Sequence, residues 1–138
     1  MEKLLKIPYK VFNDWDLLQQ FLDKKGNPIY ELVGSVYLRG RTNIIDLGSL
    51  VRVDGNLYLQ KTTIISLGNL EYVVGNLFLN ETTIESLGNL KFVGGTLNLI
   101  RSSIKSLGNL EYVGGEIYLS RDHQIPEEEL SNFKIEYY

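Results

Sequence analysis

The chain of 138 residues contains no cysteine and only one histidine. Without cysteine, the chain can form no disulfide, no thiol nucleophile and no cysteine-ligated metal site. Long hydrophobic runs are also missing, and the opening stretch MEKLLKIPYKVF is interrupted by Lys6, Pro8 and Lys10. It therefore has neither the apolar run of a signal peptide nor that of a membrane span. We expect a cytoplasmic protein without a membrane segment.

An excess of basic charge is absent as well. The chain has 14 Lys and Arg against 17 Asp and Glu, which gives a net charge of -3 and disfavours nucleic acid as the main ligand. Enzyme signals are few, because His123 has no second histidine or nucleophile in a recognisable constellation. Asp46 and Asp54 have no acidic equivalents in the neighbouring copies of the repeat described below. We therefore expect no enzyme activity, no cofactor and no metal site.

What the sequence does contain is a block that recurs every twenty residues. Leu-Gly pairs and a second series of glycines keep this step, at Leu47, Leu67, Leu87 and Leu107, and at Gly55, Gly75, Gly95 and Gly115. Such a period is typical of a stacked solenoid, in which each coil buries its apolar side chains against its neighbours. The alternation over residues 77–79 predicts one short strand per coil, and no window shows a competing helical period.

The segment L-x-L-x-x-T-x-I-x-x-L resembles the conserved segment of leucine-rich repeats, with Thr or Ser where that family most often has Asn. The resemblance covers roughly residues 29–125 in five successive copies. It implies a mainly β solenoid with one parallel sheet of short strands and an opposite side that is extended or turn-like. The pattern SLGNLxxVxGxLxL also resembles repeat proteins encoded by bacteriophages and other bacterial mobile elements.

The N-terminal region departs from the repeat and is expected to cap the first coil. Residues 1–26 contain an extended apolar segment, which covers residues 1–12, followed by a helix from Trp15 to Lys25. Asn13 or Asp14 is a suitable N-cap for this helix. Terminal caps of this kind are required in repeat arrays, because the end coils otherwise expose their apolar side chains.

The repeat region is expected to span residues 27–124 and to be followed by a C-terminal cap over residues 125–138. At the last step of the repeat, Gln124 occupies the place of an inward isoleucine. Pro126 prevents another regular coil and suits the start of a short helix. The stretch from Ile135 to Tyr138 could add a final strand that shields the edge of the last coil.

One outward column is the candidate binding site. Residues between two inward leucines point out of the sheet, and stacked coils place equivalent residues about 4.8 Å apart. This column consists of Tyr37, Tyr58, Phe78, Asn98 and Tyr118, with Arg39, Gln60, Asn80 and Ile100 beside it. Aromatic side chains next to amides are typical of recognition surfaces. We expect a protein partner here, and the mobile-element resemblance implies inhibition of a host antiviral-defence factor.

Three alternatives for this column remain open from the sequence. A sugar chain could bind along it, or the rings could merely stack and stiffen the sheet. A third alternative is that the N-terminal segment or a second copy of the chain covers it. The column offers roughly 250 Å², which is less than the roughly 800 Å² per partner of a standard interface. A protein partner must therefore also contact the turns or the caps.

Overall fold

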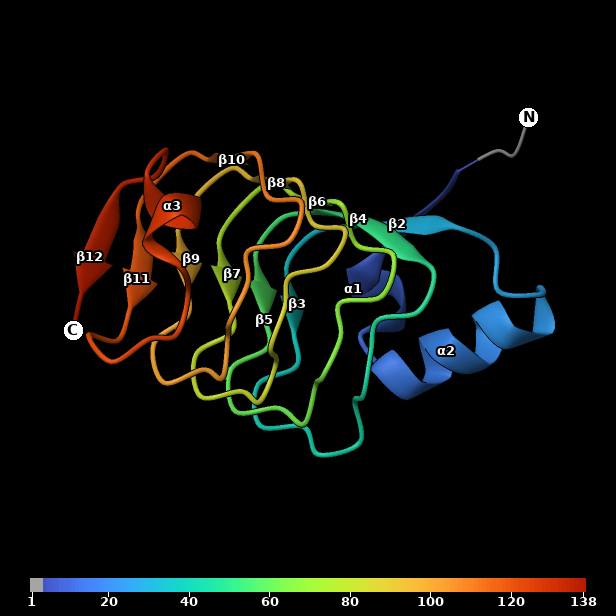
Figure 1. Ribbon diagram of the computed structural model, residues 1–138. Coiled ribbons are helices and arrows are strands. Elements are labelled where there is room, and N and C mark those ends of the chain that lie inside the picture. Colours follow the sequence, from blue (N-terminus) through green and yellow to red (C-terminus); the bar gives the residue numbers. More distant parts are fainter. Residues whose placement is uncertain (1–3) are drawn as a thin grey trace.

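The computed structural model describes residues 4–138 as a solenoid whose coils stack from the N-terminal to the C-terminal end (Figure 1). Each regular coil contributes one strand to each of two parallel six-stranded sheets. Sheet A has the order β1-β2-β4-β6-β8-β10, and sheet B has the order β12-β11-β9-β7-β5-β3. The predicted mainly β solenoid with parallel short strands is confirmed.

Sheet B contains the strands predicted from the alternating leucines. They are β3 (Val36–Tyr37), β5 (Leu57–Tyr58), β7 (Leu77–Phe78), β9 (Leu97–Asn98), β11 (Ile117–Leu119) and β12 (Ile135–Tyr137). Neighbouring coils pair in register, with Leu57 beside Leu77 and Leu77 beside Leu97. These leucines are fully buried, and each regular step of twenty residues therefore places chemically equivalent side chains side by side.

Sheet A corrects the expectation of a single parallel sheet, because a second parallel sheet adjoins sheet B along the coils (Figure 1). Its strands are β1 (Leu5–Pro8), β2 (Tyr30–Val33), β4 (Leu50–Asp54), β6 (Tyr72–Val73), β8 (Phe92–Val93) and β10 (Tyr112–Val113). Val53, Val73 and Val93 lie in register across three of these strands. Because coils of equal length align on every side, any position with an extended backbone can pair with the same position in the next coil.

Short polar side chains and glycines form the corner that leads into sheet A. The glycines that follow the corner leucines have φ between 55° and 60°, a region that glycine occupies without steric cost. Two residues before each of them, a side-chain oxygen accepts the glycine N–H at 2.7–3.0 Å. The acceptors are Asp46, Ser66, Ser86 and Ser106, and the glycines are Gly48, Gly68, Gly88 and Gly108.

The N-terminal cap contains β1, the helical turn α1 (Tyr9–Phe12) and the helix α2 (Trp15–Lys24). The carboxylate of Asp14 accepts the Leu17 N–H at 3.1 Å, which confirms the predicted N-cap. The expected extended segment is right for β1 and wrong for α1, and residues 1–3 lie outside the described part. Trp15, Leu18 and Leu22 are buried in the core. No helix between residues 4 and 138 is long and apolar enough to cross a membrane.

The C-terminal cap consists of α3 (Glu127–Leu130) and β12, which pairs parallel with β11. The short helix after Pro126 and the final strand are therefore confirmed. The inward isoleucine is Ile125, which is only 4% exposed, and not the position of Gln124. The last step from Ile104 thus takes 21 residues instead of twenty, and the final coil is longer than the regular ones.

Candidate functional site

The outward column predicted from the sequence is present on sheet B, and we call it the aromatic stripe (Tyr37, Tyr58, Phe78, Asn98 and Tyr118). The rings of Tyr37 and Tyr58 stack with centroids 4.5 Å apart and planes inclined by 10°. Tyr58 and Phe78 stack at 4.9 Å and 7°. Phe78 lies beside Asn98, which lies beside Tyr118. The register of the solenoid therefore brings all five residues into one row.

The stacking direction determines which part of each ring reaches solvent. Both faces of the Tyr58 ring are covered, one by Tyr37 and the other by Phe78. Tyr37 ends the stack, is 68% exposed and has one free ring face. At the other end of the row, Tyr118 contacts Tyr138 edge to face at 5.4 Å. The stripe thus presents mainly ring edges and hydroxyl groups to a ligand.

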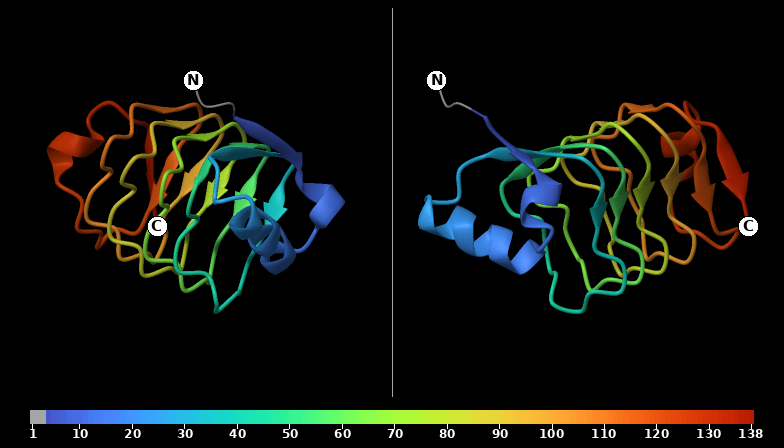
Figure 2. Two further views of the ribbon diagram at one scale, coloured as in Figure 1. Left: turned by 90° about the vertical axis from the view of Figure 1, so that its right-hand side faces the viewer. Right: turned by 180° about the vertical axis from the view of Figure 1, so that it is seen from behind.

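The N-terminal segment does not cover the stripe within the described residues. β1 pairs with β2 and so belongs to sheet A. The right-hand view of Figure 2 shows the strands of sheet B without a helix lying across them, with α1 and α2 at the N-terminal end of the solenoid. Together with the exposure of Tyr37, this arrangement excludes residues 4–26 as a cover.

The predicted flanking residues Arg39, Gln60, Asn80 and Ile100 follow the strands of sheet B, in the order expected. Arg39 is exposed and the other three are partly buried. Within residues 4–138, the side-chain oxygens of Gln60 and Asn80 are buried and have no hydrogen-bond partner. A buried polar atom without a partner costs about 1–3 kcal/mol. This side of the stripe therefore holds unused hydrogen-bonding capacity.

The turn beyond these flanking residues carries a ladder of alternating charge. Glu81 contacts Lys61 at 3.5 Å and Arg101 at 3.0 Å. The hydrogen bond from Arg101 lowers the pKa of the Glu81 carboxyl below its ordinary value. All three residues have φ between 55° and 61°, a left-handed conformation that costs a residue other than glycine roughly 1 kcal/mol. Three charges of alternating sign therefore lie in a row beside the stripe.

The opposite flank of the stripe has a structural role. The Asn56 side-chain oxygen accepts the Asn76 N–H at 2.7 Å, and the Asn76 oxygen accepts the Thr96 N–H at 2.7 Å. A Cβ added at Gly95 would overlap the Asn76 side chain. The repeated glycine is needed because it leaves room for the asparagine of the preceding coil. The side-chain oxygens of these asparagines therefore bond successive coils to one another.

A second aromatic row, which the sequence argument missed, lies on sheet A. Phe92 and Tyr112 stack at 4.9 Å and 14°, and Tyr72 packs against Phe92 at 6.2 Å and 47°. Tyr112 is 51% exposed. These residues are also twenty apart, so the same periodicity could have revealed them. The guanidinium of Arg52 lies 6.0 Å from the centre of the Tyr72 ring.

On the strands of sheet A that precede this aromatic row, the aligned positions carry charged side chains. Glu31 is buried, with its carboxylate 3.4 Å from Lys6 and 3.4 Å from Arg52. Arg52 also lies 3.7 Å from Asp54. Opposite charges on adjacent strands favour this register. The charges of this region are therefore largely paired with one another.

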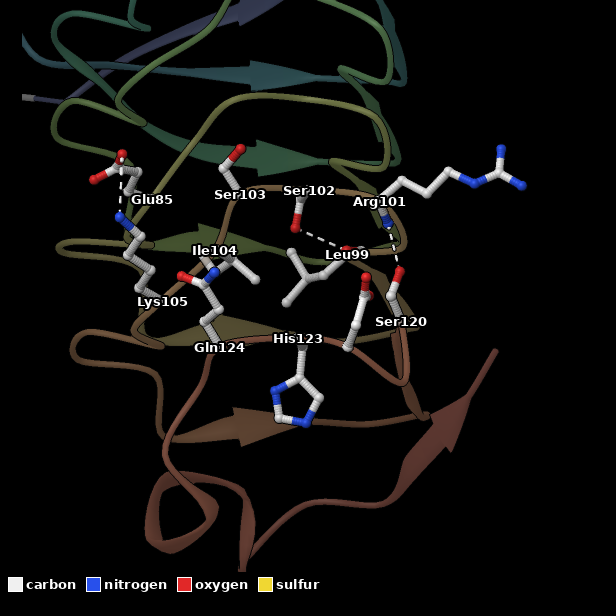
Figure 3. A pocket seen from close by; sticks show the side chains of 11 residues that line it. Glu85, Leu99, Arg101, Ser102, Ser103, Ile104, Lys105, Ser120, His123 and Gln124 are labelled. Carbon is white, nitrogen blue, oxygen red and sulfur yellow. Dashed lines mark hydrogen bonds and ion pairs between the residues drawn. The ribbon is translucent and has the colours of Figure 1, made fainter.

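A cavity of about 500 Å³ opens between residues 99–105 and residues 120–124 of the next coil, where the chain takes its longer last step (Figure 3). Its lining is mainly polar and consists of Glu85, Leu99, Arg101, Ser102, Ser103, Ile104, Lys105, Ser120, Asp122, His123 and Gln124. In the part of the chain that the structure describes, no group of three or more His, Cys, Asp or Glu side chains could hold a metal ion.

His123 borders this cavity, but its ring is engaged in holding the cap. Its Nδ1 accepts the Ile125 N–H at 3.1 Å, and its Nε2 lies 3.9 Å from the Glu127 carboxylate. The ring stacks on Tyr137 at 5.8 Å and 19°. Figure 3 shows it pointing away from the side chains of Ser102 and Ser103. His123 therefore does not face a hydroxyl nucleophile in this arrangement.

Comparison with models of known protein families, with curated proteins and with solved structures found no significant match to this chain. The class of the protein is therefore stated from its own geometry, as a capped β solenoid with two parallel sheets.

Proposed function

We propose that this protein is a non-enzymatic interaction module that binds a protein partner through the aromatic stripe of sheet B. The observation that carries the proposal is the in-register stack of Tyr37, Tyr58 and Phe78, which no segment of residues 4–138 covers. Rings that are already ordered lose little conformational freedom on binding, and such preorganisation favours affinity.

The direction of stacking favours a protein over a sugar chain. A pyranose ring packs its C–H groups against the electron-rich face of an aromatic ring. Here both faces of Tyr58 are occupied by neighbouring rings, and only the outer faces of Tyr37 and Phe78 carry no stacked ring, the face of Phe78 lying beside Asn98. Ring edges carry partial positive charge and suit carbonyl oxygens and side-chain packing, which a protein surface supplies. Carbohydrate binding along the stripe remains the second candidate.

The charge ladder next to the stripe enlarges the proposed interface. Lys61, Glu81 and Arg101 occupy the turn beyond the flanking residues, so a partner lying across sheet B would meet them. Charges at the rim of an interface mainly set the association rate and the orientation of the partner. The proposed contact surface therefore includes the stripe, its amide flank and this turn.

The narrower proposal is that the chain is a phage or mobile-element protein that inhibits a host antiviral-defence factor in the cytoplasm. Its support is the resemblance of the repeat pattern. The mechanism would be occlusion, in which a rigid preformed surface blocks a functional surface of the partner.

The test is affinity capture from the native cell with two matched double variants. Tyr58→Ala with Phe78→Ala removes the stack on sheet B, whereas Phe92→Ala with Tyr112→Ala removes the stack on sheet A. The proposal expects the first variant to lose the partner and the second to retain it, with circular dichroism showing that both fold. It is wrong if the sheet B variant retains the partner. Retention of a glycan, without a protein, that is lost only in the sheet B variant would instead establish sugar binding.

A further inference from the structure

The C-terminal edge of sheet B is open. β12 is the last strand of that sheet, and in both Figure 1 and Figure 2 no other element lies beyond it. By contrast, α1 and α2 occupy the N-terminal end of the solenoid (Figure 2). α3 is tied to the fourth coil by the Glu129 carboxylate, which accepts the Leu107 N–H at 2.9 Å. An uncovered edge strand is a template for another strand.

The hydrogen bonds of β12 show which of its backbone groups face this edge. The Lys134 carbonyl accepts the Ile117 N–H at 2.8 Å, and the Tyr138 N–H donates to the Leu119 carbonyl at 2.9 Å. Residues alternate in direction along a parallel ladder. The N–H and C=O groups of Ile135 and Tyr137 therefore point away from β11 and have no partner within residues 4–138.

The charges of β12 are self-complementary in one antiparallel register. Glu136 lies beside Tyr118 and so shares the outward face of the sheet, as does Lys134 two residues before it. If two copies pair with Ile135 opposite Ile135, Lys134 of each copy lies opposite Glu136 of the other. Opposite charges in directly opposed positions stabilise a strand pair. A register centred on Glu136 would instead place two glutamates opposite each other.

We propose that β12 pairs antiparallel with β12 of a second copy, about a two-fold axis between the two Ile135 residues. The N–H and C=O groups of Ile135 that face the open edge would bond to the same groups of Ile135 in the other copy. The axis is perpendicular to the sheet, so sheet B would continue into the second copy with both aromatic stripes on the same face. The inference concerns self-association and does not depend on the partner proposed above.

The affinity of this dimer is limited by the small area that the strand pair buries. Pairing a three-residue strand buries much less than the roughly 800 Å² per partner of a stable interface. The exposed side chain of Tyr138 adds some contact at the end of the pair. We therefore expect a concentration-dependent dimer with a dissociation constant between about 10 μM and 1 mM.

The test is sedimentation equilibrium of the whole chain up to about 2 mM in low salt, where the weight-average mass of the wild type should rise from 15.8 kDa to at least about one and a half times that value. Lys134→Glu and Glu136→Lys each place like charges opposite one another, and we expect each to weaken association at least about tenfold. The double variant restores both opposite pairs and should recover the wild-type affinity. Lys24→Glu, at the far end of the solenoid, changes the net charge as Lys134→Glu does and should leave association unchanged.

Three results would overturn the inference. The first is a wild type that stays monomeric at the highest concentration. The second is a single charge variant that associates as well as the wild type. The third is a folded double variant that associates no better than the single variants, because recovery is the specific consequence of the register centred on Ile135.

Discussion

The contact between Asn76 and Gly95 allows a direct test of how the coils are joined. Asn76→Ala removes the oxygen that accepts the Thr96 N–H at 2.7 Å, and a donor left without a partner costs about 1–3 kcal/mol. Gly95→Ala introduces a Cβ that overlaps the Asn76 side chain, and overpacking costs about 1–3 kcal/mol. With Asn76 already shortened, the nearest remaining atom is the Gly75 carbonyl carbon at 3.2 Å. A small shift of the backbone can accommodate that contact.

We therefore expect the double variant to be more stable than the sum of the two single effects implies, by at least about 1 kcal/mol. Urea denaturation followed by far-ultraviolet circular dichroism gives the required free energies of unfolding. The control cycle pairs Gly95→Ala with Asp14→Ala, which lies in the N-terminal cap and shares no contact with Gly95, and should be additive within about 0.5 kcal/mol. Additive effects in the Asn76 cycle would show that the asparagine does not set the glycine requirement.

Two further predictions concern the two ends of the solenoid. Burial raises the pKa of Tyr30 to about 12, so its contribution to stability is complete below the unfolded value near 10 and is lost as the pH rises from 10 to 12. This loss amounts to about 3 kcal/mol, and Tyr30→Phe should remove it from the alkaline unfolding curve, whereas the exposed control Tyr37→Phe should not. Glu129→Ala leaves the Leu107 N–H without its acceptor and should cost about 1–2 kcal/mol in urea denaturation. Glu128→Ala serves as its control, and equal losses in the two variants would contradict the anchoring role of Glu129.

Sheet B could be predicted from the sequence, because a constant step of twenty residues allows only one alignment of neighbouring coils. Leu57, Leu77 and Leu97 had to align if each coil had the same length, and the outward residues Tyr58 and Phe78 then had to be neighbours. The N-cap of α2 was equally predictable, because a short acidic side chain preceded an amphipathic stretch. The positions of the candidate site residues follow from periodicity alone.

The features that were missed depend on tertiary structure. The buried residues that lead into sheet A read L-x-x-V, as in Leu70 and Val73, and lack the L-x-L alternation of sheet B, so sheet A becomes visible only when coils are stacked. The place of Ile125 depends on one inserted residue, which shifts the last coil away from Gln124. α1 is a single helical turn and has no periodicity that a sequence can display.

The most direct test of the binding face is the structure of the protein in complex with the partner that it captures. The proposal predicts that Tyr37, Tyr58 and Phe78 become buried against the partner, while Tyr112 on sheet A keeps its exposure. A complex in which the stack on sheet B remains open to solvent and the partner contacts another surface would contradict it.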